Sequence, residues 1–184
     1  MDENTLSDDR GRMQLLLNGH FEETFRGFQR SAFHLEVADV YDAPDEAEPI
    51  RRFRAGEPDD FAWQKPWLDL IRETTATGRS VQRLRVVSVP HVEYTRWLLS
   101  ISHLNVDAGE VIRWLPRDEL DGLPIADDDF WLFDDRRVVF TLFTPDGSVT
   151  AAAATEDPAI VEHCVRVRDA LWPRGVPHQA YVTR

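Results

Sequence analysis

The segment ADDDFWLFDDRR (126–137) concentrates residues that could do chemistry, because five aspartates flank four consecutive apolar residues. Carboxylates at this density can bind a metal ion, act as an acid–base pair, or form the polar ends of a buried strand. If 130–133 form a strand, the two aspartate groups lie roughly 13–17 Å apart, and one metal ion cannot contact both. We expect DDRR to be a turn between two strands. Asp129 and Asp134, just outside the strand ends, are the aspartates that could face a cleft.

Arginines provide the second set of candidates, since 20 of the 21 basic residues are arginine. Arg83 and Arg85 alternate with Leu84 and Val86, which places both guanidinium groups on one face of a strand. If that face lines a cleft, the two groups could bind a carboxylate or a phosphate bidentately. If it is an outer face, they pair with neighbouring acidic residues and contribute little to stability.

Histidine and cysteine give weaker signals. The six histidines show no HxH, HExxH or Cys/His spacing, so no metal site is expected. His91 is the exception worth following, because it begins a predicted helix just after a strand end, where α/β proteins often contact ligands. Nucleophile-elbow, P-loop and dinucleotide motifs are absent. Cys164 falls on the apolar face of a predicted helix, which favours a core residue. We therefore expect no cofactor and assign no catalytic residue.

The overall charge restricts the possible partners. The sequence carries 33 acidic and 21 basic residues, a formal net charge of −12, which disfavours direct binding to nucleic acid and suits docking onto a basic partner. The N-terminal MDENTLSDDRGRM lacks the apolar centre of a signal peptide. No run approaches the ~20 apolar residues that span a membrane. These features predict a cytoplasmic protein without membrane contact.

Alternating helices and strands must position these residues. Apolar spacing predicts helices over 15–30, around 50–53, from about Pro66 to before Gly78, from Pro90 to before 105, and from Pro158 to before Pro173. Strands are predicted over 31–37, 79–88, 111–115, 130–133, 138–144 and 149–155, with PDGS (145–148) as the turn of the last pair.

The connections between these elements predict the fold class. More than twenty residues separate strands 79–88 and 111–115, which indicates a right-handed parallel crossover. We expect a single α/β domain over 13–184 with a mixed sheet, a central parallel strand–helix–strand unit, and later antiparallel strands followed by a final helix. Residues 1–12 are predicted to be a disordered lead-in.

Four blocks of the sequence resemble an uncharacterised actinobacterial family, domain of unknown function 6879, over roughly 20–178. The blocks are FHLEVADVYDAPDEAEPIRRFRAGEP, WLDLIRETTATGRSVQRLRVVS, NVDAGEVIRWLPRDE and DFWLFDDRRVVF, in this order. The resemblance implies a small soluble cytoplasmic protein whose gene often lies beside that of an Xre-type helix-turn-helix regulator. It implies no activity, so no functional position is transferred from it.

The order of elements around GRSVQRLRVV, DAGEVIRWLP and FWLFDDRRVVF also looks like the core of phospholipase D-type domains. In those domains a later strand pair carries a catalytic HxK motif. Here the comparable position holds Asp129, Phe130 and Trp131, and no HxK occurs in the sequence. This likeness implies a catalytically dead relative, of the kind that serves as a ligand-sensing or docking domain in regulators.

Three functional hypotheses remain open at this point. The first is a non-enzymatic accessory protein that docks onto a helix-turn-helix regulator encoded nearby. The second is a small-molecule-binding or sensing domain with an aromatic and arginine-lined pocket. The third is a hydrolase or transferase that uses aspartates of 127–135 with His91 or His103. The candidate ligand-binding residues are Arg83, Arg85, His91, Tyr94, Trp97, Trp114, Asp129, Trp131 and Asp134.

Overall fold

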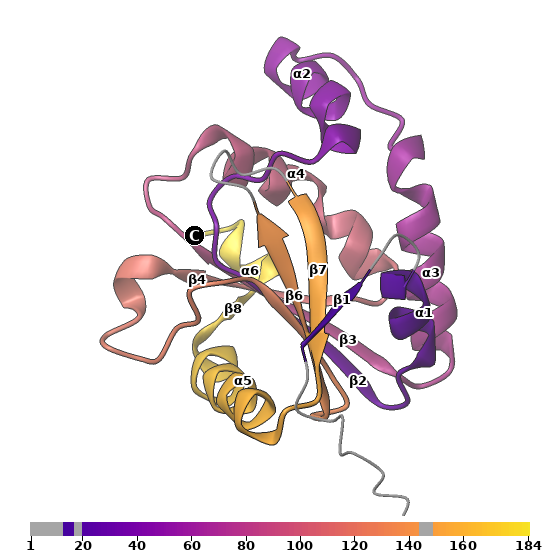
Figure 1. The fold of residues 1–184 in the computed structure, drawn as a ribbon. Helices are drawn as coiled ribbons and strands as arrows, with labels where there is room; N and C mark the ends of the chain where they lie inside the picture. Colours follow the sequence, from indigo (N-terminus) through magenta and orange to yellow (C-terminus); the bar gives the residue numbers. More distant parts are fainter. Residues whose placement is uncertain (1–12, 17–19, 144–148) are drawn as a thin grey trace, which may run out of the picture.

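The computed structural model describes residues 13–16, 20–143 and 149–184, which form an α/β fold around one mixed sheet (Figure 1). The strands are β1 (Gln14–Leu16), β2 (Ser31–Glu36), β3 (Ser80–Val87), β4 (Val111–Pro116), β5 (Phe130–Phe133), β6 (Arg137–Phe143), β7 (Val149–Thr155) and β8 (Val176–Pro177). The helices are α1 (His20–Gly27), α2 (Ala47–Ala55), α3 (Lys65–Ala76), α4 (Glu93–Asp107), α5 (Pro158–Leu171) and α6 (His178–Tyr181).

The sheet order is β1-β7-β6-β5-β2-β3-β4-β8. Strands β2, β3 and β4 are parallel, and every other neighbouring pair is antiparallel. The predicted fold class is thus confirmed, including the parallel unit in which α4 connects β3 to β4. The DDRR segment is the predicted turn between β5 and β6, where Asp134 and Asp135 adopt φ angles of 54° and 56°, a region that aspartate tolerates better than most residues.

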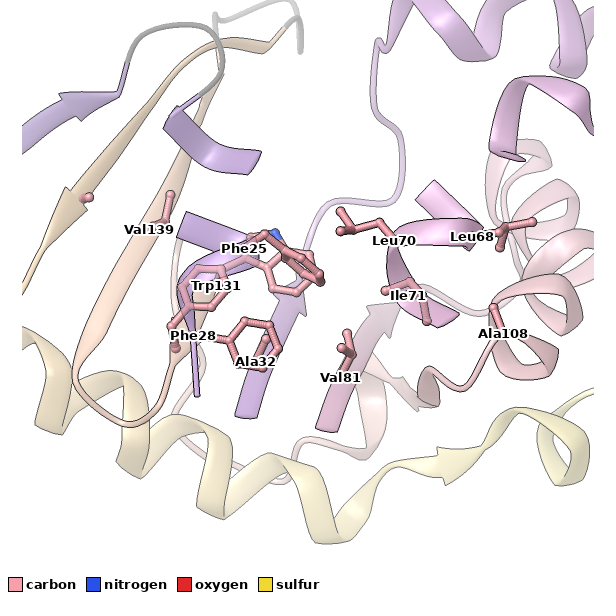
Figure 2. Packing of buried hydrophobic residues seen from close by; sticks show 12 residues of the cluster. Phe25, Phe28, Ala32, Leu68, Leu70, Ile71, Val81, Ala108, Trp131 and Val139 are labelled. Carbon is pink, nitrogen blue, oxygen red and sulfur yellow. The ribbon is translucent and has the colours of Figure 1, made fainter. Parts of the chain in front are cut away.

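Strand alternation divides the core into two faces. The His34 face carries Ala32, His34 and Glu36 of β2, with Trp131 of β5 paired opposite His34. Helices α1 and α3 cover one part of it, and α4 and α6 cover another. Figure 2 shows Phe25, Phe28 and Trp131 gathered in one aromatic group on this face. The ring centroids of Phe25 and Trp131 are 5.4 Å apart.

The Phe33 face is the opposite side of the sheet, and α5 covers it. Phe33 of β2, Leu84 of β3 and Leu132 of β5 contribute to an apolar layer there, and Leu171 of α5 packs against it. The helix begins as predicted, because the Asp157 carboxylate accepts hydrogen bonds from the backbone N–H groups of Ala159 and Ile160. Such a cap satisfies N–H groups that have no partner within the helix.

Several local predictions were wrong at their boundaries. The predicted helix over 15–30 is split, because Gln14–Leu16 pairs with β7 at the sheet edge and α1 begins at His20. A short apolar run is compatible with both the helical and the strand period, so pairing with β7 determines that Gln14–Leu16 is a strand. Helix α4 begins at Glu93 rather than at Pro90. The short β8 and α6 were not predicted, and both the lead-in 1–12 and the PDGS turn lie outside the described residues.

Candidate ligand-binding cleft

A cleft of about 390 Å³ opens on the His34 face, beside α3 and α4. A smaller recess of about 190 Å³ adjoins it and shares with it Ala43, Glu46, Arg83, Arg85 and Leu98. Tryptophan side chains form much of the wall of the larger cleft, namely Trp63, Trp67 and Trp131. The recess is lined by His34, Glu36, Tyr41, Tyr94, Asp129 and Thr141 in addition to the shared residues. An aromatic cleft with a few converging polar groups is typical of small-molecule sites.

Two arginines form the charged floor of this cleft. Arg83 Nη1 donates to a Glu36 carboxylate oxygen, and Arg83 Nε donates to Glu110 Oε1 at 2.7 Å. Arg85 Nε donates to the other Glu36 oxygen, and Arg85 Nη1 donates to Ser102 Oγ at 2.7 Å. We call Glu36, Arg83, Arg85 and Glu110 the ion network. All four are at most 9% exposed, so they are the buried kind of ion pair that needs close geometry to offset its desolvation.

The network gives Glu36 an unusual protonation behaviour. Burial by itself raises the pKa of a carboxyl, but Arg85 and Arg83 outweigh it and hold the pKa of Glu36 well below its ordinary value. Burial lowers the pKa of Arg83, but Glu110 and Glu36 raise it by more, so the pKa of Arg83 is higher than its ordinary value. Glu36 and Arg83 therefore stay ionised at neutral pH. Because its positive charge is compensated by buried carboxylates, the arginine pair differs from the free anion site that the sequence suggested.

Aromatic rings hold the guanidinium groups in place. Arg83 Cζ lies 5.7 Å from the ring centroid of Trp131 and 5.9 Å from that of Trp67. Arg85 Cζ lies 5.1 Å from the centroid of Trp114. Cation–π contacts at these distances are favourable, and they limit the rotamers of both arginines. The floor of the cleft is therefore preorganised.

His34 lines the recess without a hydrogen-bond partner. Its ring stacks on Trp131 at a centroid distance of 4.2 Å and an interplanar angle of 11°. Nδ1 lies 3.3 Å from Glu36 Oε1, yet neither ring nitrogen makes a hydrogen bond within the described part of the chain. Burial lowers the pKa of His34 to about 3, an effect that Glu36 opposes and Arg83 reinforces. The imidazole is therefore neutral at pH 7, with one donor and one acceptor nitrogen.

Gln64 carries a second unpartnered buried atom on this face, and its side chain lines the larger cleft. It ends the 3₁₀ turn η3 (Ala62–Gln64), is 8% exposed, and its Oε1 has no hydrogen-bond partner among the described residues. Buried polar side chains in native proteins are nearly always hydrogen-bonded, so each exception needs an explanation. Two exceptions lining adjoining hollows point to a shared cause.

Two carboxyl groups of the recess are held by tyrosines. Tyr94 Oη donates to Glu46 Oε2 at 2.6 Å. Asp129 Oδ1 accepts from the Val37 backbone N–H at 2.7 Å, and the Asp129 carboxyl is also hydrogen-bonded to Tyr41. Burial raises the pKa of Glu46, against the effect of Tyr94. Burial raises the pKa of Asp129 to about 6, against the hydrogen bond from Tyr41.

The structure brings most of the predicted candidates together. Arg83, Arg85 and Trp131 line the larger cleft, and Tyr94 and Asp129 line the recess. Two others lie behind the lining within the core, namely Trp97, which stacks on Trp63, and Trp114, which lies under Arg85.

The remaining two candidates lie elsewhere. His91 is held by Ser88 O at 2.9 Å and Tyr181 Oη at 3.1 Å, and it lines neither the cleft nor the recess. The Asp134 carboxylate accepts from the backbone N–H groups of Gln29, Arg30 and Ser31, so it fixes the start of β2. Backbone hydrogen bonds to both residues indicate structural roles.

The proposed combination of aspartates with His91 or His103 is therefore not assembled. Asp129 lies at one end of β5 in the recess, and Asp134 follows the other end. His103 is exposed and contacts Ser100 O at 3.0 Å. In the described part of the chain, no group of three or more His, Cys, Asp or Glu side chains could hold a metal ion. Within the same residues, no helix is long and apolar enough to cross a membrane.

The residues of this site that sequence reasoning missed include His34, Glu36, Glu46, Gln64 and Glu110. A signal was available for two of them. His34 and Glu36 alternate with apolar residues on one strand, as Arg83 and Arg85 do on the next parallel strand. Polar residues at matching positions of two neighbouring buried strands indicate a shared polar cluster rather than an outer face.

The sequence matches the model of one protein family, domain of unknown function DUF6879, over residues 19–183. The chain belongs to this family. A search of curated proteins found no match.

Solved structures with a similar fold include NucT from Helicobacter pylori, at 9% identity and a TM-score of 0.46, covering 90% of this chain and 98% of that one. Phosphatidylserine synthase from Haemophilus influenzae Rd KW20 has 11% identity and a TM-score of 0.45. The match covers 90% of this chain but 38% of the synthase. These likenesses concern the outline of the fold and carry no argument about activity.

Proposed function

We propose that this DUF6879 protein is a small-molecule-binding domain whose ligand lies in the cleft and recess of the His34 face. One observation carries the proposal: both ring nitrogens of His34 and the Oε1 atom of Gln64 are buried, belong to side chains that line adjoining hollows, and have no hydrogen-bond partner among the described residues. A buried unsatisfied polar group costs about 1–3 kcal/mol. A ligand that supplies both partners recovers this free energy on binding.

The surrounding residues support the same proposal. The ion network is not required for stability in the middle of a sheet, because a protein with well-packed apolar side chains there is often as stable or more stable. Natural sequences break such rules mainly at functional sites. The tryptophans Trp63 and Trp67 are only partly buried, so part of each indole surface remains available to a flat or apolar ligand.

A thermal-shift screen with matched variants tests this proposal. The probes are amines, amino acids, nucleosides, nucleotides and short carboxylic acids. We expect at least one compound to raise the melting temperature of the wild type but not that of Gln64→Leu or His34→Phe. Gln179→Leu serves as the control, because Gln179 is exposed on α6 away from the cleft. Without ligand, Gln64→Leu should unfold at or above the wild-type temperature, since the substitution removes an unsatisfied group. Shifts that persist in both cleft variants would refute the site.

We also propose that the protein docks onto a basic surface of a regulator, the helix-turn-helix protein encoded nearby being the partner expected from the family resemblance. The formal net charge of −12 supports this second function, because it favours association with a basic partner. Co-expression followed by size-exclusion chromatography tests it. We expect one complex at low salt that weakens as the salt concentration rises. Separate elution of the two proteins at micromolar concentration and low salt would contradict it.

A further inference from the structure

We infer that the recess binds a positively charged nitrogen group of the ligand that carries N–H donors, such as an amine, a guanidine or an amidine. The inference rests on the proposed function and names the chemical class of its ligand. Its basis is the placement of Glu46 and Asp129, which line the recess beside the unpartnered imidazole of His34.

The charges that line the recess do not balance. Within the ion network, two arginines face two carboxylates, Glu36 and Glu110, so the network is neutral as a whole. Glu46 and Asp129 are additional carboxyl groups. In the described part of the chain, no basic side chain forms a salt bridge with either of them. A cationic ligand would supply the missing counter-charge in a setting where an ion pair is only weakly screened.

The tyrosines complete a site suited to a cation. The rings of Tyr41 and Tyr94 lie 5.8 Å apart at 58° and both line the recess. Each hydroxyl is engaged with a carboxyl group, which leaves the carboxyl oriented and the ring as part of the wall. Aromatic walls combined with carboxylates are a recurring way to recognise ammonium groups.

His34 is the independent sign that a ligand is bound here. The residue is 9% exposed, and a neutral imidazole offers a lone pair to an N–H donor. An anionic group would meet the carboxyls of Glu36, Glu46 and Asp129 instead. The volume of about 190 Å³ admits a head group the size of roughly six water molecules. The larger cleft, with its tryptophans, then holds the rest of the ligand.

Titration calorimetry with matched pairs of probes tests the inference. Each pair differs in charge but little in shape: benzamidine with benzamide, and benzylamine with benzyl alcohol. Measured at pH 8, where Asp129 is ionised, we expect at least one cation to bind about tenfold or more tightly than its neutral partner. Glu46→Gln and Asp129→Asn should each weaken that cation about tenfold and leave the neutral compound unchanged. Both substitutions keep an acceptor oxygen for the tyrosine.

The control variant is Asp128→Asn, which makes the same change in charge at an exposed neighbouring position and should bind like the wild type. Circular dichroism confirms that each variant is folded. Equal effects of Asp128→Asn and Asp129→Asn would overturn the recess as the cation site. If instead nucleotides or carboxylic acids bind, and binding is lost in His34→Phe and Gln64→Leu, then the ligand class is wrong while the proposed function holds. Failure of every probe, whatever its charge, to bind at millimolar concentration would count against both.

Discussion

The two faces of the sheet use the same strands in opposite ways. On the Phe33 face, β2, β3 and β5 contribute an apolar layer beneath α5, as in Leu35, Leu84 and Leu132. On the His34 face, the intervening positions of β2 and β3 are His34 and Arg83, and Trp131 lies beside them. One face is a packed layer, whereas the other encloses charges, unpartnered atoms and a cleft.

This difference separates what the fold needs from what the site needs. An apolar layer stabilises the sheet through area removed from water and close packing. The ion network has to offset the desolvation of four charged groups before it contributes anything. The apolar layer of the Phe33 face therefore contributes to folding without a buried ion network. The His34 face retains an arrangement that stability alone does not require.

The largest expected effect comes from breaking the ion network at its centre. Glu36→Ala leaves Arg83 buried with one carboxylate, Glu110, and removes the carboxylate that Arg85 contacts. Removing one partner of a buried network costs about 3–5 kcal/mol. Urea denaturation should show this decrease in the free energy of unfolding. A change under about 1 kcal/mol would mean that water reaches the arginines freely.

A four-residue variant sharpens the same comparison. Glu36→Leu, Arg83→Met, Arg85→Met and Glu110→Leu together replace every charge of the network with apolar groups. We expect stability equal to or above that of the wild type, as for other buried networks replaced in this way, together with loss of ligand binding. A loss of several kcal/mol would show that the His34 face also depends on its charges for folding.

The second prediction removes apolar volume from the opposite face. Leu84 is fully buried under α5, and Leu84→Ala should lower the free energy of unfolding by about 2–5 kcal/mol through lost burial and the cavity left behind. Because Leu84 points away from the cleft, the ligand affinity measured by calorimetry should stay unchanged. An affinity change of tenfold or more would show that the two faces are energetically coupled.

The period of the apolar residues was sufficient to predict most of the fold. Strand β3 and helix α4 are long and are bounded by clear start and stop signals. Their assignment as strand and helix, and the parallel crossover to β4, therefore follow from the sequence. The strand at 14–16 does not, because three residues show no period and pair only through the distant β7. Strand β8 has the same difficulty, being two residues held by pairing with Arg113 and Trp114.

Residues of the site were predictable only where the alternation of polar and apolar residues along a strand placed them on one face. Arg83 and Arg85 on one face were foreseen, and the sheet places them in the cleft. The neutralisation of the two arginines by Glu36 and Glu110 was not foreseen. It depends on the order of the strands and on the carboxylate of Glu110, which is 27 residues from Arg83 in the sequence. Glu46 reaches the recess from a 3₁₀ turn, η2 (Pro44–Glu46). Loop geometry of this kind leaves no periodic signal in the sequence.

The third prediction concerns the pH dependence of stability. The pKa of His34 is lowered to about 3, so between pH 6.5 and 3 the unfolded chain binds a proton that the folded chain does not. Acid therefore favours unfolding through this group, and its stabilising contribution is lost as pH falls below 6.5. From pH 7 to pH 5 the wild type should lose about 2 kcal/mol more than His34→Gln, which does not titrate.

The other titratable groups facing His34 are retained in both proteins, so their contributions cancel in the difference. They are Glu36, Tyr41, Glu46, Arg83, Arg85, Tyr94 and Asp129. Asp129 acts in the opposite direction, because its raised pKa of about 6 stabilises the fold as pH falls from 6 towards 4. Parallel pH profiles for the wild type and His34→Gln would contradict a neutral buried imidazole.

The smallest predicted effect tests the helix that covers the Phe33 face. The Asp157 carboxylate accepts from the N–H groups of Ala159 and Ile160 and so caps α5. Asp157→Ala should cost about 1 kcal/mol, whereas Asp157→Asn, which also caps well, should cost less. Because α5 packs on the Phe33 face, we expect both variants to keep the wild-type affinity and the wild-type difference between pH 7 and pH 5. A change in either property would mean that α5 supports the cleft through the sheet, and that the two faces are not separate units of stability and binding.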